Sequence, residues 1–302
     1  MDRYRVARAA TVGEGKLGRI KTMSFNIKSV IIAIIIFVTV PFGLRWYYNK
    51  THPRYVLPPP TREEVTLTII PGWNLRQVAE YLVLKEFASS TDLVLEQTGK
   101  PAKFFKPKLV LPDFSGVLAP WIKKPTQISY EGYFAPETIR VYRNARLAEV
   151  LEKFALERHR QLLVLRPDSA GDLSYNWHEI LTMASIVEEE ASHDEDRAKV
   201  ADILWRRFKA GWALQVDSSV HYAVDKTGDL FTTAKERQID SPWNTYKYPG
   251  LPPSPICNPG LSSIEAAVHP EKNEYWYFLS GRDGKMHYAK TLEEHNANKK
   301  YL

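Results

Sequence analysis

Cysteine is almost absent from this chain of 302 residues, which contains only Cys257. A single cysteine excludes an intrachain disulfide framework and any metal site built from several cysteines. It says little about the redox compartment, because a folded domain of this size can do without disulfides. The remaining composition, with 44% hydrophobic and 25% charged residues, is that of an ordinary globular protein, and the length suffices for one or two domains with hydrophobic cores.

Several catalytic signatures are missing as well. The chain has no G-x-S-x-G elbow of a serine hydrolase and no P-loop. The histidines His269, His287 and His295 are far apart and show neither H-E-x-x-H nor Cys/His spacing, so we expect no metal site. Nothing in the chain calls for an organic cofactor either. By elimination, acid catalysis by a carboxyl group is the leading chemistry.

Basic charge is unevenly spread along the chain. The net charge is +6, but before residue 29 seven basic residues face only Asp2 and Glu14, and the rest of the chain is close to balanced. The charge therefore predicts no nucleic-acid partner. The seven basic residues are Arg3, Arg5, Arg8, Lys16, Arg19, Lys21 and Lys28.

A long apolar run follows this basic segment. Val30–Leu44 reads VIIAIIIFVTVPFGL, and residues 25–46 provide about the twenty residues that cross a hydrocarbon core. Lys28 can snorkel at its start, and the aromatic residues from Trp46 onward resemble an interfacial belt. We predict a single transmembrane helix over 25–46, with residues 1–24 as a cytoplasmic basic tail and the rest of the chain outside.

Two alternatives to a membrane anchor fit this run less well. A cleaved signal peptide would need small residues in an A-x-A-like site, and none follows Leu44 before the aromatic residues. A buried core helix is possible for a run of about fifteen residues, but this run is apolar on every side, as a membrane span is. Residues 47–63, which include THPRYVLPPP, predict a stiff, proline-rich linker after the anchor.

The next segment has the pattern of a small strand–turn–helix unit. Val65–Ile70 predicts a strand and Pro71–Gly72 a turn, and Asn74 is the expected N-cap of an amphipathic helix. A further amphipathic helix over Leu147–Leu156 is expected to open the main domain. Two more short strands are predicted at Lys108–Leu111 and Thr126–Tyr130.

Glu131 begins a segment with the sequence EGYFAPET. An acid beside a glycine, two aromatic residues and a proline can line a carbohydrate groove, because aromatic faces stack on sugar rings. The same cluster is typical of a tight domain junction. Taken alone, it favours the structural interpretation.

The stretch Ile180–Ala191, ILTMASIVEEEA, places three carboxylates at the end of an apolar helical pattern. At 3.6 residues per turn, Glu190 shares the most apolar stripe, whereas Glu188 and Glu189 lie over smaller or more polar neighbours. A carboxyl group among apolar side chains has a raised pKa, as a general acid needs near neutral pH. An acidic triplet is also typical of a solvated helix face, so the sequence downstream decides between the two.

Downstream, Ser192 and Glu195 have the capping-box spacing of a new helix, which Gly211 should end. Ala213–Ala223, ALQVDSSVHYA, then alternates like a strand with one polar face. That face fits a groove and a plain surface strand equally well. Its residues are Gln215, Asp217, Ser219 and His221.

The segment Ser241–Gly260 is rich in proline and aromatic residues and predicts a long ordered loop, which is more often functional than a spacer. Its Asn244 and Tyr246 offer an amide and a hydroxyl group that can bind sugar hydroxyl or N-acetyl groups. Strand residues from Tyr275 to Leu279, a turn and His287–Tyr288 then predict a hairpin, whose aromatic residues are expected in the core rather than in the site.

These segments together resemble the endolytic murein transglycosylases of the MltG (YceG-like) family. The resemblance covers roughly residues 64–296 with the order of the motifs kept, and VTLTIIPGWNLRQVAEYL is similar to the small LysM-like module of that family. The motifs that carry it are EGYFAPET, MASIVEEEA (Met183–Ala191), ALQVD (Ala213–Asp217), SPWNTY (Ser241–Tyr246), GLPPSPICNPG (Gly250–Gly260), AAVHP (Ala266–Pro270) and YFLSGRDGKMHYAKTLEEHN (Tyr277–Asn296).

The resemblance implies a single-pass inner-membrane protein whose outer, periplasmic domain cuts nascent peptidoglycan strands internally, with peptidoglycan synthases of the same membrane as candidate partners. The bond is the β-1,4 link between N-acetylmuramic acid and N-acetylglucosamine, and the product carries a 1,6-anhydro end. The family's catalytic glutamate is the second acid of an I-E-x-E motif, which falls on Glu190. The implied groove residues are Glu131, Glu188, Gln215, Asp217, Asn244 and Tyr246.

We therefore expect an α+β protein: residues 64–140 form the LysM-like module and residues 141–302 the catalytic domain. Two other functions stay open, a catalytically silent peptidoglycan-binding scaffold and a hydrolytic muramidase in which Asp217 activates water. Where the family usually reads LQTDPTVIYG, this chain reads LQVDSSVHYA, with Val216 for a threonine, Ser218 for a proline and His221 for an isoleucine. These departures lie in the groove and leave the acid in place.

Overall fold

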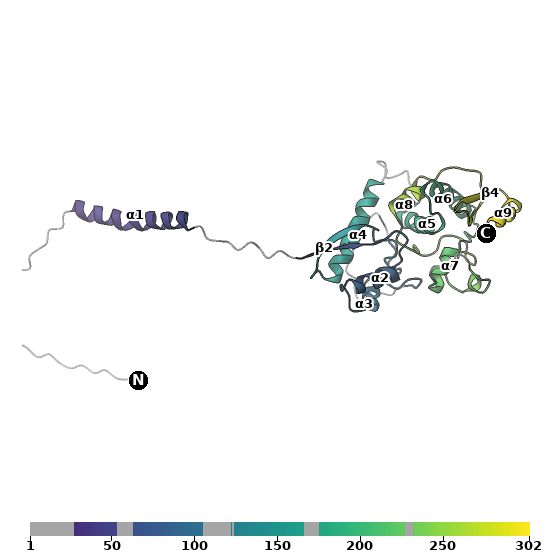
Figure 1. The fold of residues 1–302 in the computed structure, drawn as a ribbon, viewed down its shortest axis with the longest axis horizontal. Coiled ribbons are helices and arrows are strands. Elements are labelled where there is room, and N and C mark those ends of the chain that lie inside the picture. The colour runs from purple at the N-terminus through teal and green to yellow at the C-terminus, as the bar shows by residue number, and fades with distance from the viewer. Residues whose placement is uncertain (1–26, 53–62, 105–121, 123, 166–174, 227–231) are drawn as a thin grey trace, which may run out of the picture. The chain divides into compact units, whose positions relative to one another are not determined.

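The structure is a computed structural model that divides into two compact units, residues 1–61 and 62–302. It describes residues 27–52, 63–104, 122, 124–165, 175–226 and 232–302 (Figure 1).

The first unit contains one described helix, α1 (Ile27–Thr51), of 25 residues. The membrane span predicted over residues 25–46 falls on this helix. Among the described residues, however, no helix has both the length and the apolar character needed to cross a membrane.

The second unit combines helices with short strands, in agreement with the α+β prediction (Figure 1). Its described strands form two antiparallel sheets of two strands each, β1–β2 and β3–β4. In chain order the elements are β1 (Glu64–Thr68), α2 (Leu75–Leu84), α3 (Thr91–Thr98), β2 (Thr138–Tyr142), α4 (Leu147–Val164), α5 (Trp177–Glu190), α6 (Asp194–Lys209), α7 (Asp217–Val224), η3 (Glu236–Gln238), α8 (Leu261–Val268), β3 (Tyr277–Ser280), β4 (Met286–Ala289), α9 (Leu292–Asn298) and η4 (Lys299–Tyr301).

The strand–turn–helix unit is confirmed in β1 and α2. Asn74 caps α2 with a capping box, in which its side chain accepts backbone N–H groups and Gln77 reaches back to the N-cap N–H. β1 pairs with β2 in register from Glu64 opposite Tyr142 to Thr68 opposite Thr138. The boundary expected at residues 140/141 thus lies inside β2, and one buried cluster runs from Leu67 to Ala267.

The strand predicted at Thr126–Tyr130 is wrong, because the segment forms turns. Its polar groups are satisfied elsewhere: Lys124 Nζ donates to the carbonyl of Ile128 at 2.6 Å, and the N–H of Tyr130 donates to the carbonyl of Thr98 at 2.7 Å. The strand predicted at Lys108–Leu111 lies outside the described residues.

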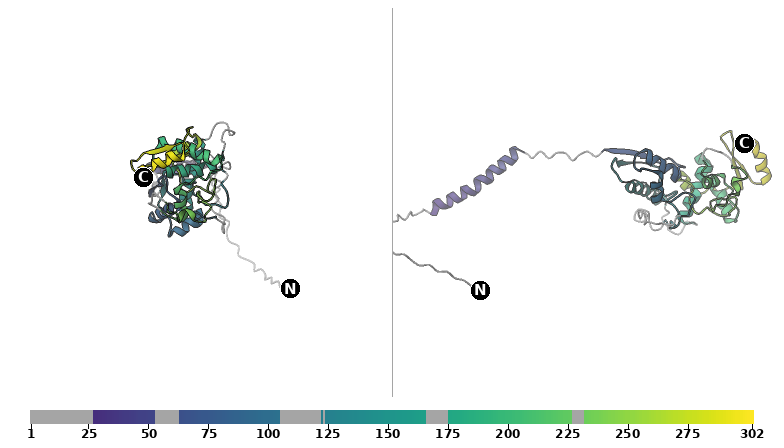
Figure 2. Two further views of the ribbon diagram at one scale, coloured as in Figure 1. Left: turned by 90° about the vertical axis from the view of Figure 1, so that its right-hand side faces the viewer. Right: turned by 90° about the horizontal axis from the view of Figure 1, so that it is seen from below.

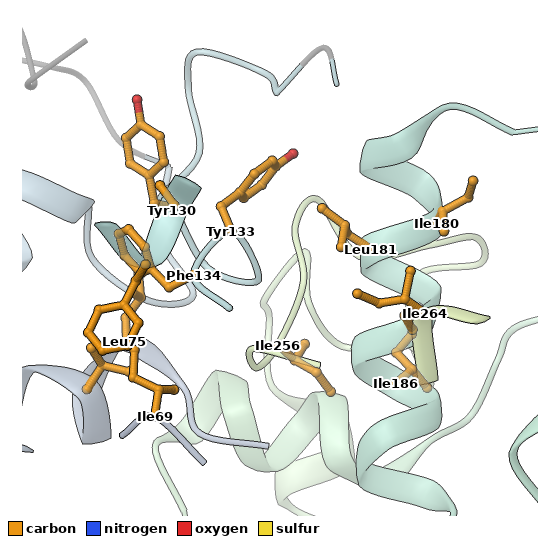
Figure 3. Packing of buried hydrophobic residues seen from close by; sticks show 14 of the residues in the cluster. Ile69, Leu75, Tyr130, Tyr133, Phe134, Ile180, Leu181, Ile186, Ile256 and Ile264 are labelled. Atoms are coloured by element: carbon orange, nitrogen blue, oxygen red, sulfur yellow. The ribbon is translucent and has the colours of Figure 1, made fainter. Parts of the chain in front are cut away.

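Helix α5 runs through the core of the second unit and packs against α6, α7 and α8. Nine of its residues are buried, from Trp177 to Val187, which agrees with the apolar pattern of the sequence. In Figure 3 the side chain of Ile186 on α5 lies beside that of Ile264 on α8, with Leu181 further along the same helix. This packing fixes where the acidic end of α5 lies.

The start of α6 differs from the expected capping box. The helix begins at Asp194 with His193 as N-cap, and no side chain caps it. Three acids in the first turn, Asp194, Glu195 and Asp196, interact favourably with the helix dipole instead, so Ser192 is not needed as a cap. The end is as predicted, because Gly211 follows α6 with a φ of +71°.

The strand predicted over Ala213–Ala223 is wrong, since Asp217–Val224 forms helix α7. The extended segment stops at Gln215, which has a φ of +56° and turns the chain. Asp217 is then an acid in the first turn of a helix, a favourable place for it. Val216 and Val220, both buried, are four residues apart and fit a helix as well as a strand, which made the alternation ambiguous.

The proline-rich loop lies along α5 and is fastened to it. Ser185 Oγ accepts the N–H of Ile256 at 3.0 Å, and Glu188 Oε2 accepts the N–H of Gly260 at 2.8 Å. The fully buried Asn258 joins this loop to two other segments, because its Oδ1 accepts the N–H of Phe134 and its Nδ2 donates to the carbonyl of Trp73.

A buried arginine adds another connection to the same loop. Arg158 of α4 has no exposed surface, and its Nη2 donates to the carbonyls of Phe134 at 3.1 Å and Pro259 at 2.7 Å. Burial lowers the pKa of Arg158 to about 9. The EGYF segment, α4 and the loop are therefore held together by hydrogen bonds from two buried side chains.

The predicted hairpin is confirmed in β3 and β4, where Tyr277 lies opposite Ala289 and Ser280 opposite Met286. Helix α9 packs on both strands, and the three elements lie together in the yellow part of Figure 2.

Gly132 offers a test of the contact between the EGYF segment and the loop. It has a φ of +82°, and a Cβ there would lie 2.5 Å from Cβ of Pro255. Gly284 has a φ of +74° with open space around it, so alanine there brings only the backbone strain. We expect Gly132→Ala to lower the free energy of unfolding by about 1–3 kcal/mol more than Gly284→Ala, as measured by urea denaturation. Equal losses would contradict the close contact.

Candidate active site

A cleft of about 840 Å³ opens where the C-terminal end of α5 meets the first turn of α7. The start of α2, the loop at Tyr246, Arg207 of α6, strand β3 and helix α9 form further parts of its wall. The sequence-predicted residues that line it are Glu190, Gln215, Asp217 and Tyr246.

Glu190 is the last residue of α5 and is half-buried in the wall of the cleft. Ser218 Oγ donates a hydrogen bond to its Oε1 at 2.7 Å. Burial raises the pKa of Glu190 above its ordinary value, the hydrogen bond from Ser218 opposes this, and the charge of Asp217 raises it further. The sequence expectation of a half-buried acid with a raised pKa is met at this position.

The other two acids of the triplet have different surroundings. Glu188 has a side chain only 7% exposed and forms an ion pair with Arg197 at 3.1 Å, in addition to its bond from Gly260. It is thus more buried than its polar neighbours suggested, and it fastens the loop instead of lining the cleft. Glu189 is exposed and does line the cleft.

Asp217 and Tyr246 meet in the cleft wall. The hydroxyl of Tyr246 donates to Asp217 Oδ1 at 2.6 Å, Thr232 Oγ1 donates to the same oxygen at 2.5 Å, and Arg237 lies 3.5 Å from it. The guanidinium of Arg237 also lies over the ring of Tyr246 at 4.8 Å. Burial and the bond to Asp217 raise the pKa of Tyr246, which keeps its phenol protonated. Gln215 is exposed nearby.

Asn244 and Glu131, both predicted in the groove, are fully buried and do not line the cleft. The amide of Asn244 donates to the carbonyls of Arg237 and Ile239 and so shapes its own loop. Glu131 accepts the N–H of Leu75 at the start of α2, at 3.0 and 3.1 Å, and the hydroxyl of Tyr222 at 3.0 Å. These two polar residues stabilise the fold around the cleft.

Sequence reasoning missed several residues of the cleft. Arg207 is 7% exposed, and its guanidinium donates to the carbonyls of Leu214 and Trp276, so a buried cation lies near Glu190 and forms no ion pair with a carboxylate of the described residues. Tyr277 of the hairpin lines the cleft although its aromatic neighbours suggested the core. Neither residue carries a sequence signal, because the fold alone brings α6 and β3 to this place.

Sequence reasoning also missed Thr245, a buried residue outside the cleft lining that fixes the start of α7. Its Oγ1 accepts the N–H of Val216 at 3.1 Å and lies 2.8 Å from Oγ of Ser219, while its carbonyl accepts the N–H of Gln215 at 3.2 Å.

Within the described part of the chain, no group of three or more His, Cys, Asp or Glu side chains is placed to hold a metal ion.

The sequence model of the YceG-like family matches residues 54–301. The chain belongs to the YceG-like family. A crystal structure of a yceG-like protein from Listeria monocytogenes superposes with a TM-score of 0.65 at 31% identity, covering 77% of this YceG-like chain and 75% of that one.

Two curated relatives carry the name endolytic murein transglycosylase. The one from Bacillus subtilis is 49% identical over 126 residues, which are 41% of this chain and 35% of that protein. The one from Streptococcus pneumoniae strain R6 is 31% identical over 174 residues, which are 56% of this chain and 31% of that protein. The match to this YceG-like chain thus spans about a third of the length of each.

Glu131 should give the folded chain a characteristic pH dependence. Burial raises its pKa from 4.5 to about 8, so the folded state holds a proton that the unfolded state releases above about pH 4.5. Stability therefore falls as the pH rises from about 4.5 to about 8. We expect Glu131→Gln to reduce this slope in urea denaturation curves, to which the raised pKa values of Glu189 and Glu190 also contribute, whereas Glu96→Gln, on the exposed face of α3, leaves it unchanged. An unchanged slope in Glu131→Gln would mean that another group causes it.

Proposed function

We propose that this chain is a lytic transglycosylase that cuts peptidoglycan strands internally, at the β-1,4 bond between N-acetylmuramic acid and N-acetylglucosamine. The observation that carries the proposal is the position of Glu190, a half-buried carboxyl group with a raised pKa in the wall of a large cleft. The names of the curated relatives support the same activity.

In the proposed reaction Glu190 protonates the glycosidic oxygen, and the sugar passes through an oxocarbenium-like state. The same carboxylate then takes the proton of the muramoyl C6 hydroxyl as that oxygen closes the 1,6-anhydro ring. The proton lost by Glu190 in the first step is thus regained in the second, and no water is consumed. One carboxyl group serves both steps.

Arg207 and Asp217 shift the pKa of Glu190 in opposite directions. The buried guanidinium of Arg207 favours the carboxylate of Glu190, whereas the charge of Asp217 favours the protonated acid. A group that must be an acid in one step and a base in the next requires such a balance. Gln215 and Tyr246, which line the same cleft, offer an amide and a hydroxyl group to the sugar.

A hydrolytic muramidase would need Asp217 as the base that activates water. In this chain Oδ1 of Asp217 already accepts bonds from Tyr246 and Thr232 and lies beside Arg237. These partners occupy the carboxylate oxygen that would have to bind a water molecule, which favours ring closure. A silent scaffold would have no need for an acid with a raised pKa in a cleft.

The apolar run of residues 25–46 supports a further proposal, that the chain is anchored in the cytoplasmic membrane with its catalytic part outside the cell. We expect the full chain in the membrane fraction of cells and a chain without residues 1–50 in the soluble fraction. Recovery of the full chain in the soluble fraction would contradict the anchor.

The division into a LysM-like module, residues 64–140, and a catalytic domain, residues 141–302, likewise stays a proposal.

The catalytic assignment is tested by Glu190→Gln, which keeps the shape of the side chain and removes its acid. We expect cleavage of isolated glycan strands to fall by about 10²–10⁴-fold, while the circular dichroism spectrum stays that of the unchanged chain. Glu195→Gln, in the exposed first turn of α6, is the matched control and should cleave at the normal rate. Full activity in Glu190→Gln would refute the assignment.

Mass spectrometry of the products separates the competing chemistries in the same experiment. Anhydro ends lack the water that hydrolysis adds, so a lytic transglycosylase gives products lighter by one water. Products with reducing ends would favour the muramidase, and binding to glycan strands without any product would favour the scaffold.

A further inference from the structure

Ser218 is the polar residue in closest described contact with Glu190. It is the second residue of α7, and its Oγ donates to Glu190 Oε1 at 2.7 Å. The backbone N–H of Ser218 also interacts with this carboxyl group and lowers its pKa. N–H groups in the first turn of a helix have no partner within the helix, so this donor is available to the carboxyl. The last residue of α5 thus closes onto the first turn of α7.

We infer that Ser218 is the positioning residue for Glu190, and that it determines which carboxyl oxygen carries the catalytic proton. This inference rests on the proposed function. A hydroxyl that donates to Oε1 makes this oxygen the carbonyl-type oxygen of the neutral acid. The proton is then on Oε2, the oxygen that delivers it to the glycosidic bond. A rotated carboxyl group would present the wrong oxygen to the substrate.

Ser218 also affects the acidity of Glu190, because both of its donors favour the carboxylate. The charged groups that face Glu190 from the neighbouring elements are Arg207 of α6, which also favours the carboxylate, and Asp217 of α7, which favours the acid. Glu189 precedes it on α5, and Tyr246 faces it from the loop. Removing Ser218's donors leaves the burial of Glu190 opposed mainly by Arg207, so the pKa of Glu190 should rise.

Two substitutions remove the two donors in steps, and a third keeps both. Ser218→Ala removes the hydroxyl and keeps the N–H, and Ser218→Pro removes both in the first turn of α7, where the lost N–H has no partner within the helix. Ser218→Thr keeps both donors. The matched control is Ser192→Ala, which removes an exposed hydroxyl two residues after Glu190.

We expect the alkaline limb of the cleavage rate against pH to move up by about one pH unit in Ser218→Ala and further in Ser218→Pro. We also expect kcat to fall by about tenfold at the pH optimum with KM unchanged, because the carboxyl group loses its fixed orientation. Ser218→Thr should keep the alkaline limb and kcat at their wild-type values, and Ser192→Ala should change neither of them. An alkaline limb that stays in place in Ser218→Ala, or that moves equally in Ser192→Ala, would overturn the inference.

A direct titration of Glu190 separates this inference from the proposed function. The carboxyl signal of Glu190 is identified in spectra of the full chain labelled with ¹³C-glutamate as the one lost in Glu190→Gln. A pKa that rises in Ser218→Ala while no protein cleaves glycan would support the role of Ser218 and overturn the proposed function. An unchanged pKa in Ser218→Ala together with normal cleavage by the wild-type chain would overturn the inference and leave the function standing.

Discussion

The fastening of the proline-rich loop along α5 is the constraint on which the rest of the second unit depends. A loop without regular structure cannot be buried unless other groups satisfy its backbone N–H and C=O groups. Here Ser185 and Glu188 of α5 accept its N–H groups, and Arg158 donates to one of its carbonyls. Asn258 then ties the loop to the start of α2. The polar residues in the core are therefore part of its construction.

This construction determines the geometry of the cleft. Because α5 is packed on α6 and α8 and covered by the loop, its last residue, Glu190, has one fixed position. Thr245 holds the residues that precede α7, so the first turn of this helix, with Asp217 and Ser218, faces Glu190. Two helix ends that are far apart in the chain thus form one site, in which burial and neighbouring charge together adjust the proton affinity of a carboxyl group.

Local sequence signals predicted the elements that depend on local interactions. The cap at Asn74, the apolar stripe under Glu190, the glycine after α6 and the β3–β4 hairpin all depend on residues a few positions apart. The segment of α7 was misjudged because the spacing of Val216 and Val220 suits both a strand and a helix, and the conformation at Gln215 decides between them.

The groove residues were harder to predict, because a polar residue in a loop can serve a ligand or the loop itself. Asn244, Glu131 and Glu188 serve the fold, and only their hydrogen-bond partners, which come from remote segments, reveal this. Arg207 and Tyr277 enter the cleft through tertiary packing, which a single sequence does not display.

The pairing of β1 with β2 has a consequence for dissecting the protein. A fragment that starts at residue 141 would keep only the end of β2, without the strand that completes its ladder. It would also uncover apolar side chains that now contact α2, and it would leave Asn258 without its acceptor at Trp73. We therefore expect a fragment of residues 141–302 to fold poorly by itself, and enzymology on it would report on a damaged scaffold.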